Sequence, residues 1–295
     1  MKILLLGKDG QVGHELQRAL QPLGEVIALG RTAADLQNLP GLKTVLAAHA
    51  PRIIVNAAAY TAVDKAESDE AAAFRVNAEA VGVLAAWARD SGALLVHYST
   101  DYVFDGSKTT VYSETDDPNP QSVYGKSKRA GETAIQHSGC NALIFRTSWV
   151  FSAHGGNFIK TILRLAAERD SLNVVADQQG TPTSAELIAD VTALAIPGYF
   201  SRTLPPGIYH LTAAGTTTWH EFACHVVARA RANGAALKLD VRQIRAITTA
   251  EYPLPAKRPA NSCLDTRALR NALGLGLPDW TIHVDRTVDQ LTRRE

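Results

Sequence analysis

Short runs of apolar residues recur through the first half of the chain, each followed by a longer segment with helical spacing. The runs are KILLLG, EVIALG, RIIVNAA, ALLVHYST and ALIFRTSWV. Continuous apolar runs of this length are typical of strands buried on both faces of a parallel sheet. The segments between them with helix-forming composition are Gln11–Gln21, Ala66–Asp90 and Ser122–His137. This alternation predicts an α/β fold with a doubly wound (Rossmann) parallel sheet.

The regular alternation of apolar runs and helical segments ends after about Trp149. Helices are predicted at GGNFIKTILRLAAERD, at SAELIADVTALAI and, after a Thr cap, at TTWHEFACHVVARARANG, with a short strand at GIYHLTA. We therefore expect an NAD(P)-binding Rossmann domain over residues 1–150. Residues 151–295 are expected to form mainly a smaller α/β substrate-binding region, interleaved with the last sheet elements.

Composition narrows the class of protein. The chain has 295 residues, 46% of them hydrophobic and 20% charged, with a formal net charge of +1. A balanced charge gives no reason to expect a nucleic acid or an anionic membrane as partner. The N-terminal apolar run is too short for a signal peptide, and no stretch has the length of a membrane helix. With three widely spaced cysteines, read as buried free thiols, we expect a cytoplasmic protein.

Gly7, Gly10 and Gly13 form a G-x-x-G-x-x-G sequence directly after the first predicted strand and at the start of a helix. Such a loop lets the backbone approach a pyrophosphate, and the helix N-terminus offers free N–H groups. The alternative is a plain tight turn, but its place between strand and helix favours dinucleotide binding.

The end of the second strand separates the two nicotinamide cofactors, because an acidic residue there holds the ribose hydroxyls and an arginine accommodates a 2′-phosphate. Gly30 and Arg31 stand at this point. The sequence therefore favours NADPH, with NADH as a weaker alternative. Asp35 follows as a candidate contact to adenine, and the small residues of NAAAYT leave room for a flat cofactor.

The fourth strand turns polar at Tyr98, Ser99 and Thr100, at the edge where parallel sheets bind ligands. Further on, Tyr124 and Lys128 are four residues apart in VYGKSKRAGE, which places them on one face of a helix. A lysine there favours ionisation of the phenol. An ordinary polar helix face is the alternative for the pair alone, whereas the glycine loop and the polar strand end favour catalysis.

Seven segments, in order along nearly the whole chain, resemble the extended short-chain dehydrogenase/reductase superfamily, and within it the reductases of dTDP-linked 4-keto sugars. They are GKDGQVG, VNAAAYTAVDKAE, HYSTDYVFDG, VYGKSKRAGE, FRTSWVF, GTTTWHEFA and RPANSCLDT. The resemblance implies hydride transfer from NADPH to the C4 ketone of dTDP-4-dehydro-L-rhamnose. It makes Tyr124 the proton donor, assisted by Lys128 and Thr100.

The resemblance also implies the binding residues. For the cofactor they are, besides the glycines and Arg31, Gln11, Val12, Asp35, Leu36, Ala59, Tyr60, Thr61, Tyr98, Tyr124 and Lys128. For the nucleotide-sugar substrate they are Thr100, Asp101, Trp149, Arg258 and Asn261, with Ser262 beside them and Arg258 suited to a diphosphate.

A metal site and a dimer are less well supported. Some members of the superfamily bind Mg²⁺ at a dimer contact through three glutamates. Glu15 and Glu186 match two of these positions, but Gln290 stands at the third. Because Mg²⁺ prefers charged oxygen ligands, we expect no tight metal site, and the homodimer stays an open possibility. The histidines show no metal-ligand spacing.

Two other functions remain open at this point. A nucleotide-sugar dehydratase or epimerase is one, but a dehydratase needs a second acidic group beside Asp101, and Tyr102 stands there. A non-catalytic, cofactor-binding regulatory subunit is the other, and the presence of both Tyr124 and Lys128 argues against it.

Overall fold

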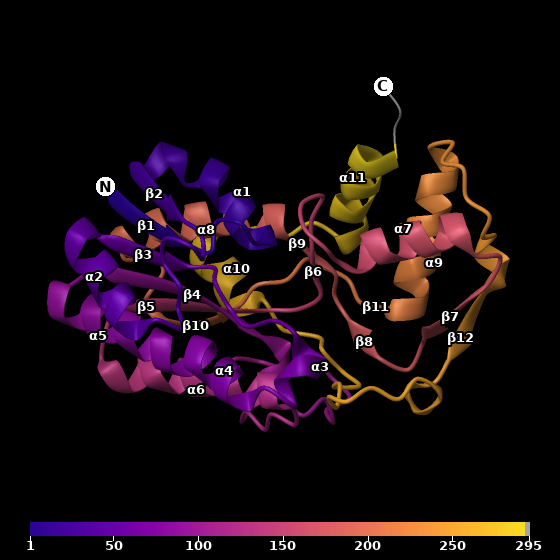
Figure 1. Ribbon diagram of the computed structural model, residues 1–295. Helices are drawn as coiled ribbons and strands as arrows, with labels where there is room; N and C mark the ends of the chain where they lie inside the picture. The colour runs from indigo at the N-terminus through magenta and orange to yellow at the C-terminus, as the bar shows by residue number, and fades with distance from the viewer. Residues whose placement is uncertain (293–295) are drawn as a thin grey trace.

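The computed structural model describes residues 1–292, so the last three residues of the predicted 151–295 region lie outside it. Its centre is a six-stranded, fully parallel sheet in the order β2-β1-β3-β4-β5-β10 (Figure 1). The strands are β1 Lys2–Leu6, β2 Glu25–Leu29, β3 Ile53–Asn56, β4 Leu94–Thr100, β5 Ala142–Thr147 and β10 Gly207–His210. The predicted doubly wound α/β class is confirmed. The order reverses at β1, so a crevice opens beyond the carboxyl ends of β1 and β3.

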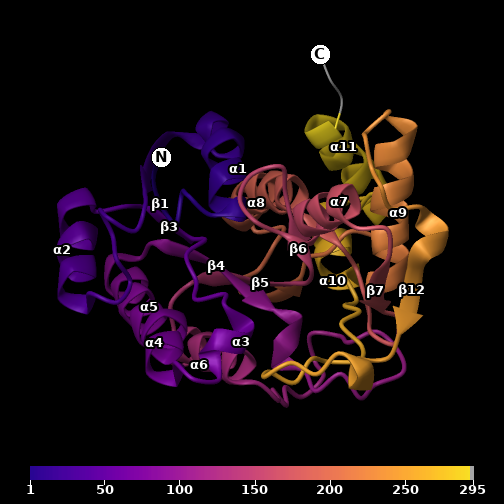
Figure 2. The ribbon, with the colours of Figure 1, turned by 45° about the vertical axis from the view of Figure 1, so that its right-hand side comes forward.

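Helices cover both faces of the sheet (Figure 2). On one face lie α1 Gln11–Ala19 and α8 Ala185–Phe200, packed against one another. On the other lie α2 Leu39–His49, α5 Ala80–Ser91 and α6 Val123–Ser138. Each face has its own apolar core, and the strands contribute alternate residues to the two: Ile3 and Leu5 to one, Leu4 and Leu6 to the other.

The later part of the chain both completes the sheet and builds a second lobe, on the right in Figure 1. β10 pairs with β5, and α10 Arg267–Leu273 packs nearby. The second lobe holds α7 Phe158–Glu168, α9 Trp219–Ala232, α11 Trp280–Thr292 and the parallel pair β7 Leu172–Val175 and β12 Ile244–Ile247. Short pairs between the lobes are β6 Val150–Phe151 with β9 Thr183–Ser184, and β8 Gln179–Gly180 with β11 Thr217–Thr218. Single 3-10 turns lie at Gln21–Leu23, Asp101–Val103, Val241–Gln243 and Thr249–Glu251.

The predicted helix over Ala66–Asp90 is not continuous. It is replaced by α3 Val63–Ala66, α4 Glu70–Phe74, a π-helical turn at Arg75–Glu79 and then α5. The turn brings the buried Asn77 amide to the backbone of Tyr60, accepting from its N–H at 2.9 Å and donating to its carbonyl at 3.0 Å. These bonds fix the segment after β3, and π turns of this kind are frequent at functional sites.

The start of α9, the cysteines and the lengths of the helices were also considered in the sequence. α9 begins at the predicted Thr cap: the Thr218 hydroxyl accepts from the Glu221 N–H, and the Glu221 carboxylate accepts from the Thr218 N–H. The cysteines form no disulfide among the described residues; Cys263 is buried, whereas Cys140 and Cys224 are only partly so. Through residue 292, no helix combines the length and the apolar character needed to cross a membrane.

Candidate functional site

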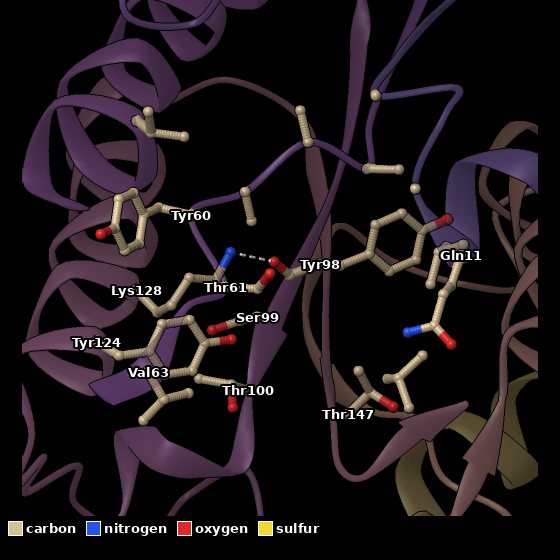
Figure 3. Close-up of a pocket in the computed structure, with 18 of the residues that line it drawn as sticks. Gln11, Tyr60, Thr61, Val63, Tyr98, Ser99, Thr100, Tyr124, Lys128 and Thr147 are labelled. Atoms are coloured by element: carbon tan, nitrogen blue, oxygen red, sulfur yellow. Dashed lines mark hydrogen bonds between the residues drawn. The ribbon is translucent and has the colours of Figure 1, made fainter. Parts of the chain in front are cut away.

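A cavity of about 650 Å³ lies at the carboxyl edge of the sheet, at the crevice beside β1 and β3 (Figure 3). It collects most of the residues singled out from the sequence, although they come from distant segments. Those that line it are Gly7, Gly10, Gln11, Val12, Arg31, Asp35, Leu36, Ala59, Tyr60, Thr61, Tyr98, Thr100, Asp101, Tyr124, Lys128 and Trp149. Four others, Gly13, Arg258, Asn261 and Ser262, are not among its lining residues.

The glycine loop needs its glycines for close approach. Gly7 has a φ of +82°, and a β-carbon there would lie 2.6 Å from the Ala58 nitrogen. Gly13 lies beneath the loop, where a β-carbon would come within 2.0 Å of the Gly7 carbonyl oxygen. At the start of α1, Gly10 offers no side-chain cap and the first turn has no acidic residue. The first N–H groups of the helix are therefore available to an anionic group.

Tyr124, from the first turn of α6, reaches into the cavity beside the end of β4 (Figure 3). The Thr100 hydroxyl donates to Asp101 Oδ1 at 2.9 Å and lies within hydrogen-bonding reach of the Tyr124 side chain. Asp101 is buried, and its Oδ2 has no hydrogen-bond partner among the described residues. Burial raises the pKa of Asp101 to about 6, against the lowering influence of the nearby hydroxyl groups of Ser262 and Thr100. The cluster therefore offers a phenol, a hydroxyl and a carboxyl group at one end of the cavity.

Lys128 lies one turn further along α6 and is 2% exposed. Its Nζ donates to the Tyr98 carbonyl oxygen at 2.6 Å, the bond drawn in Figure 3, and lies 3.4 Å from His97 Nε2. Burial lowers the pKa of Lys128 to about 8, while the charge of Glu132 raises it. The lysine thus titrates close to neutral pH.

The sequence interpretation expected Lys128 to bring the pKa of Tyr124 down. In the structure burial dominates and raises the pKa of Tyr124 above its ordinary value, against the opposing influence of the nearby Thr100 hydroxyl. Removing a phenolate from water costs more than these neighbours return. The phenol is accordingly protonated at neutral pH, which is the form that a proton donor requires.

Tyr98 is placed differently from the other polar residues of its strand. Its ring lines the cavity, but its hydroxyl shares a 2.8 Å hydrogen bond with Thr192 of α8. The Tyr98 hydroxyl thereby anchors α8 to the sheet, and its carbonyl group holds Lys128.

Two stacked tryptophans form the wall on the side of the second lobe. Trp149 and Trp219 lie face to face, with ring centroids 3.6 Å apart and planes 13° from parallel. Trp149 has a φ of +49°, and a β-carbon at Gly180 would lie 2.4 Å from its indole ring. Trp219 was not singled out from the sequence, because an aromatic residue at the start of an amphipathic helix is most simply read as core.

A second cavity, of about 1020 Å³, adjoins the first through Trp219, which lines both. Its walls come from α7, β7 and the segment that carries Arg258. Arg258 donates to Asp64 of α3 from Nη1 at 2.8 Å and from Nη2 at 2.7 Å. The arginine expected to handle the substrate therefore lies at the neighbouring cavity and is paired with a carboxylate.

Asn261 has a different environment from the one expected. It is 9% exposed, and its Nδ2 donates to the carbonyl oxygens of Lys108 and Thr110 at 2.7 and 2.8 Å. Its Oδ1 accepts from the Cys263 N–H at 2.9 Å. These bonds join two loops, and the residue lines neither cavity.

The glutamates considered for Mg²⁺ lie on neighbouring helices. Glu15 of α1 is close enough to Glu186 of α8 for that charge to raise its pKa, after the larger effect of burial. Glu186 is paired with Arg286 of α11 at 3.1 Å. Within residues 1–292, no group of three or more His, Cys, Asp or Glu side chains is arranged to hold a metal ion.

Comparisons with known proteins agree with this geometry. Residues 1–293 match the family model described as RmlD substrate binding domain. The chain is 51% identical to dTDP-4-dehydrorhamnose reductase of Burkholderia thailandensis, over 99% of both chains. A crystal structure of a dTDP-4-dehydrorhamnose reductase from Clostridium acetobutylicum matches with a TM-score of 0.89 and 36% identity, over 99% of each chain. The Bacillus anthracis enzyme in complex with NADP matches with a TM-score of 0.88 and 32% identity, over 98% and 99%. The chain therefore belongs to the dTDP-4-dehydrorhamnose reductase family, within the extended short-chain dehydrogenases/reductases.

Proposed function

We propose that this protein reduces the C4 ketone of dTDP-4-dehydro-L-rhamnose to dTDP-L-rhamnose with NADPH, and that Tyr124 is the proton donor. The observation that carries the proposal is the cluster of Tyr124, Thr100 and Lys128 in the cavity that the glycine loop borders. The substrate is that of the dTDP-4-dehydrorhamnose reductases to which the chain is similar. The cytoplasmic location predicted from the sequence fits an enzyme that makes a nucleotide sugar.

The residues at the crevice fit a dinucleotide. The bare N-terminus of α1 would bind its pyrophosphate, since the N–H groups there have no side-chain cap. Ala57, Ala58 and Ala59 line the cavity without bulk, and Arg31 would meet a 2′-phosphate. When bound, the reduced nicotinamide supplies the hydride. The NADP held by the Bacillus anthracis relative supports this cofactor.

Proton delivery rests on the chain's own groups. As negative charge develops on the ketone oxygen, the Tyr124 phenol transfers its proton to it as a general acid. The Thr100 hydroxyl donates a second hydrogen bond to the same oxygen, releasing its bond to Asp101. The ammonium group of Lys128 stabilises the phenolate that remains. Asp101 accepts a hydrogen bond from a sugar hydroxyl.

The nucleotide half of the substrate would occupy the second cavity. Arg169 and Lys257 line it and provide cationic groups for a diphosphate, and Arg258, which is paired with Asp64, would exchange that carboxylate for the diphosphate. Glu251 is the only acidic residue among the described lining residues of this cavity. Trp219 lines both cavities, so a substrate that spans them would pass the Trp149–Trp219 pair. The sugar would then lie against Trp149 while its ketone faces Tyr124.

The first experiment is the decay of absorbance at 340 nm when purified protein meets NADPH and dTDP-4-dehydro-L-rhamnose, with NADH in parallel. We expect stoichiometric NADPH oxidation and a dTDP-L-rhamnose product identified by NMR. An epimerase or dehydratase would convert a nucleotide sugar without net NADPH consumption. Tight cofactor binding without turnover of the substrate would instead favour the regulatory subunit.

A further inference from the structure

The carboxylate of Asp9 fills the space that a side chain at position 30 would take. A β-carbon built on Gly30 would lie 2.0 Å from Asp9 Oδ2 and 3.1 Å from its Cγ. Gly30 directly follows β2, at the point where a carboxylate ordinarily holds the adenosine ribose hydroxyls of NADH. The glycine loop thus brings a carboxylate to that place from a different segment of the chain.

Backbone bonds account for this approach. The N–H groups of Gly7 and Lys8 both donate to the carbonyl oxygen of Leu29, at 2.9 and 3.3 Å, which ties the glycine loop to the end of β2. On its other side the loop is held by His154, whose Nε2 donates to the Asp9 carbonyl oxygen at 3.2 Å. The backbone of Asp9 is therefore fixed between the end of β2 and His154. The Asp9 side chain is exposed and lines the cavity.

Arg31 directly follows Gly30 in the chain and lines the same cavity as Asp9. Its side chain is 74% exposed, and its Nε lies 3.6 Å from Asp35 Oδ2. A carboxylate accepts hydrogen bonds from two ribose hydroxyls but repels a 2′-phosphate, whereas a guanidinium group binds that phosphate. The ribose end of the cavity thus carries one group suited to each nicotinamide cofactor.

We infer that Asp9 is a specificity-determining residue that replaces the missing acid at position 30 and lets this chain bind NADH as well as NADPH. The inference rests on the proposed nicotinamide-dependent function. It revises the expectation, based on Gly30 and Arg31, that NADH is only a weaker alternative to NADPH. Asp9 holds the ribose hydroxyls of NADH, and Arg31 holds the 2′-phosphate of NADPH.

The test is the Kd of each cofactor, measured by the fluorescence of the reduced nicotinamide with the full-length protein. Asp9→Asn should weaken NADH binding about tenfold or more while NADPH binding stays equal or tightens. Arg31→Gln should give the opposite pattern. Asp90→Asn is the control, because it neutralises an exposed carboxylate that does not line the cavity, and it should leave the NADH Kd within about twofold of wild type.

A rescue variant strengthens the test. Asp9→Gly combined with Gly30→Asp removes the first carboxylate and supplies one at the usual position, so NADH binding should return. An unchanged NADH Kd in Asp9→Asn, or equal losses for both cofactors, would overturn the inference. If wild type binds both cofactors and Asp9→Asn selectively weakens NADH binding, but the protein reduces no nucleotide sugar, only the proposed reaction fails. If it reduces the sugar and Asp9→Asn has no effect on NADH, only the inference fails.

Discussion

Arg146 of β5 and Glu132 of α6 form a buried, doubly hydrogen-bonded ion pair. Arg146 donates from Nε to Oε1 at 2.8 Å and from Nη2 to Oε2 at 2.7 Å, and neither side chain is more than 1% exposed. Because Glu132 lies one turn beyond Lys128 on α6, the pair fixes the helix that carries Tyr124 and Lys128 against β5.

Glu132→Gln should lower the free energy of unfolding by roughly 3–5 kcal/mol, since it leaves the Arg146 charge buried without a counterion. Chemical denaturation measures this loss. Glu168→Gln is the control, because Glu168 pairs with Arg164 on the surface, with both side chains more than half exposed. It should cost less than about 1 kcal/mol. Similar losses in the two variants would contradict the structural role of the buried pair.

Tyr124→Phe should lower kcat by roughly 10²–10⁴ and leave the NADPH Kd nearly unchanged, because it removes only the transferable proton. Steady-state kinetics and cofactor titration measure the two quantities. Tyr102→Phe serves as control: its ring lies edge-on to that of Tyr124, with centroids 5.6 Å apart. We expect a much smaller loss of kcat there, and near-normal turnover of Tyr124→Phe would refute the assignment.

Asp101 should make stability depend on pH. Burial raises its pKa to about 6, so between its ordinary pKa near 4 and pH 6 the folded state binds more protons than the unfolded state. Stability from this group is therefore present at pH 4 and is lost as the pH rises through 6. Asp101→Asn should raise the free energy of unfolding at pH 7 by roughly 1–3 kcal/mol and change it little at pH 4.

Asp105→Asn should behave oppositely. Hydrogen bonds from Ser107 hold the pKa of Asp105 below its ordinary value, with a further bond from Asn119. The stability that this carboxylate contributes is present above its unfolded-state pKa and is lost as the pH falls. The variant should therefore lose stability at pH 7. Thermal unfolding at both pH values compares the two variants, and a shared sign at pH 7 would count against the Asp101 assignment.

Two buried histidines should differ in tautomer. Asn56 Oδ1 accepts from the Ala58 N–H at 3.2 Å, which turns its Nδ2 toward His97 Nδ1, also at 3.2 Å. His97 Nδ1 is then an acceptor, and the proton of the neutral ring is on Nε2. His210 Nδ1 lies 3.1 Å from the Tyr112 carbonyl oxygen, which can only accept, so its proton is on Nδ1.

Nitrogen-15 NMR of the imidazoles distinguishes these forms without any substitution. The expected result is one Nε2–H and one Nδ1–H ring. It has a consequence for Lys128, because an Nε2–H group directed at the ammonium disfavours its charged form. We assign the higher of the pKa values in the pH profile of kcat to Lys128. His97→Gln should therefore raise this pKa, whereas His210→Gln should not. An Nδ1–H form of His97 would contradict the proposed effect of His97 on the charge of Lys128.

Trp219→Leu should raise the KM for the nucleotide sugar by about tenfold or more, because it removes one face of the aromatic stack between the cavities. Leucine keeps an apolar contact to Phe158, whose ring centroid lies 4.7 Å from that of Trp219. The NADPH Kd should not change. Trp87→Leu, at a site outside both cavities, provides the control.

Much of the fold was predictable because burial on both faces of a parallel strand leaves a continuous apolar run. β1 to β5 all coincide with such runs, and β10 with a shorter one. The two-residue strands at Gln179, Thr183 and Thr217 leave no periodic pattern and escaped prediction, whereas Val150 of β6 was predicted only as the end of the run ALIFRTSWV. The π turn at Arg75–Glu79 was also missed, because its cause is the distant bonding of Asn77 and not local propensity.

The site was predictable to the extent that strand ends converge at one edge of a parallel sheet. That rule brings Thr100 to the cavity that the glycine loop borders. It cannot predict the partner that a long side chain selects, so the pairing of Arg258 with Asp64 and the loop contacts of Asn261 were not foreseen. The approach of Asp9 to Gly30 likewise depends on how the glycine loop bonds to β2.

The position of β10 at the outer edge of the sheet has a consequence for synthesis of the protein. Its partner β5 carries the buried Leu143 and Phe145, yet β10 is translated only after α7 and α8. At ~5–20 residues per second, the backbone of β5 emerges from the ribosome several seconds before the strand that pairs with it. During that interval the nascent chain presents an open apolar strand to its surroundings, which favours aggregation. Premature termination of translation anywhere before residue 207 therefore yields an aggregation-prone fragment and not a smaller functional protein.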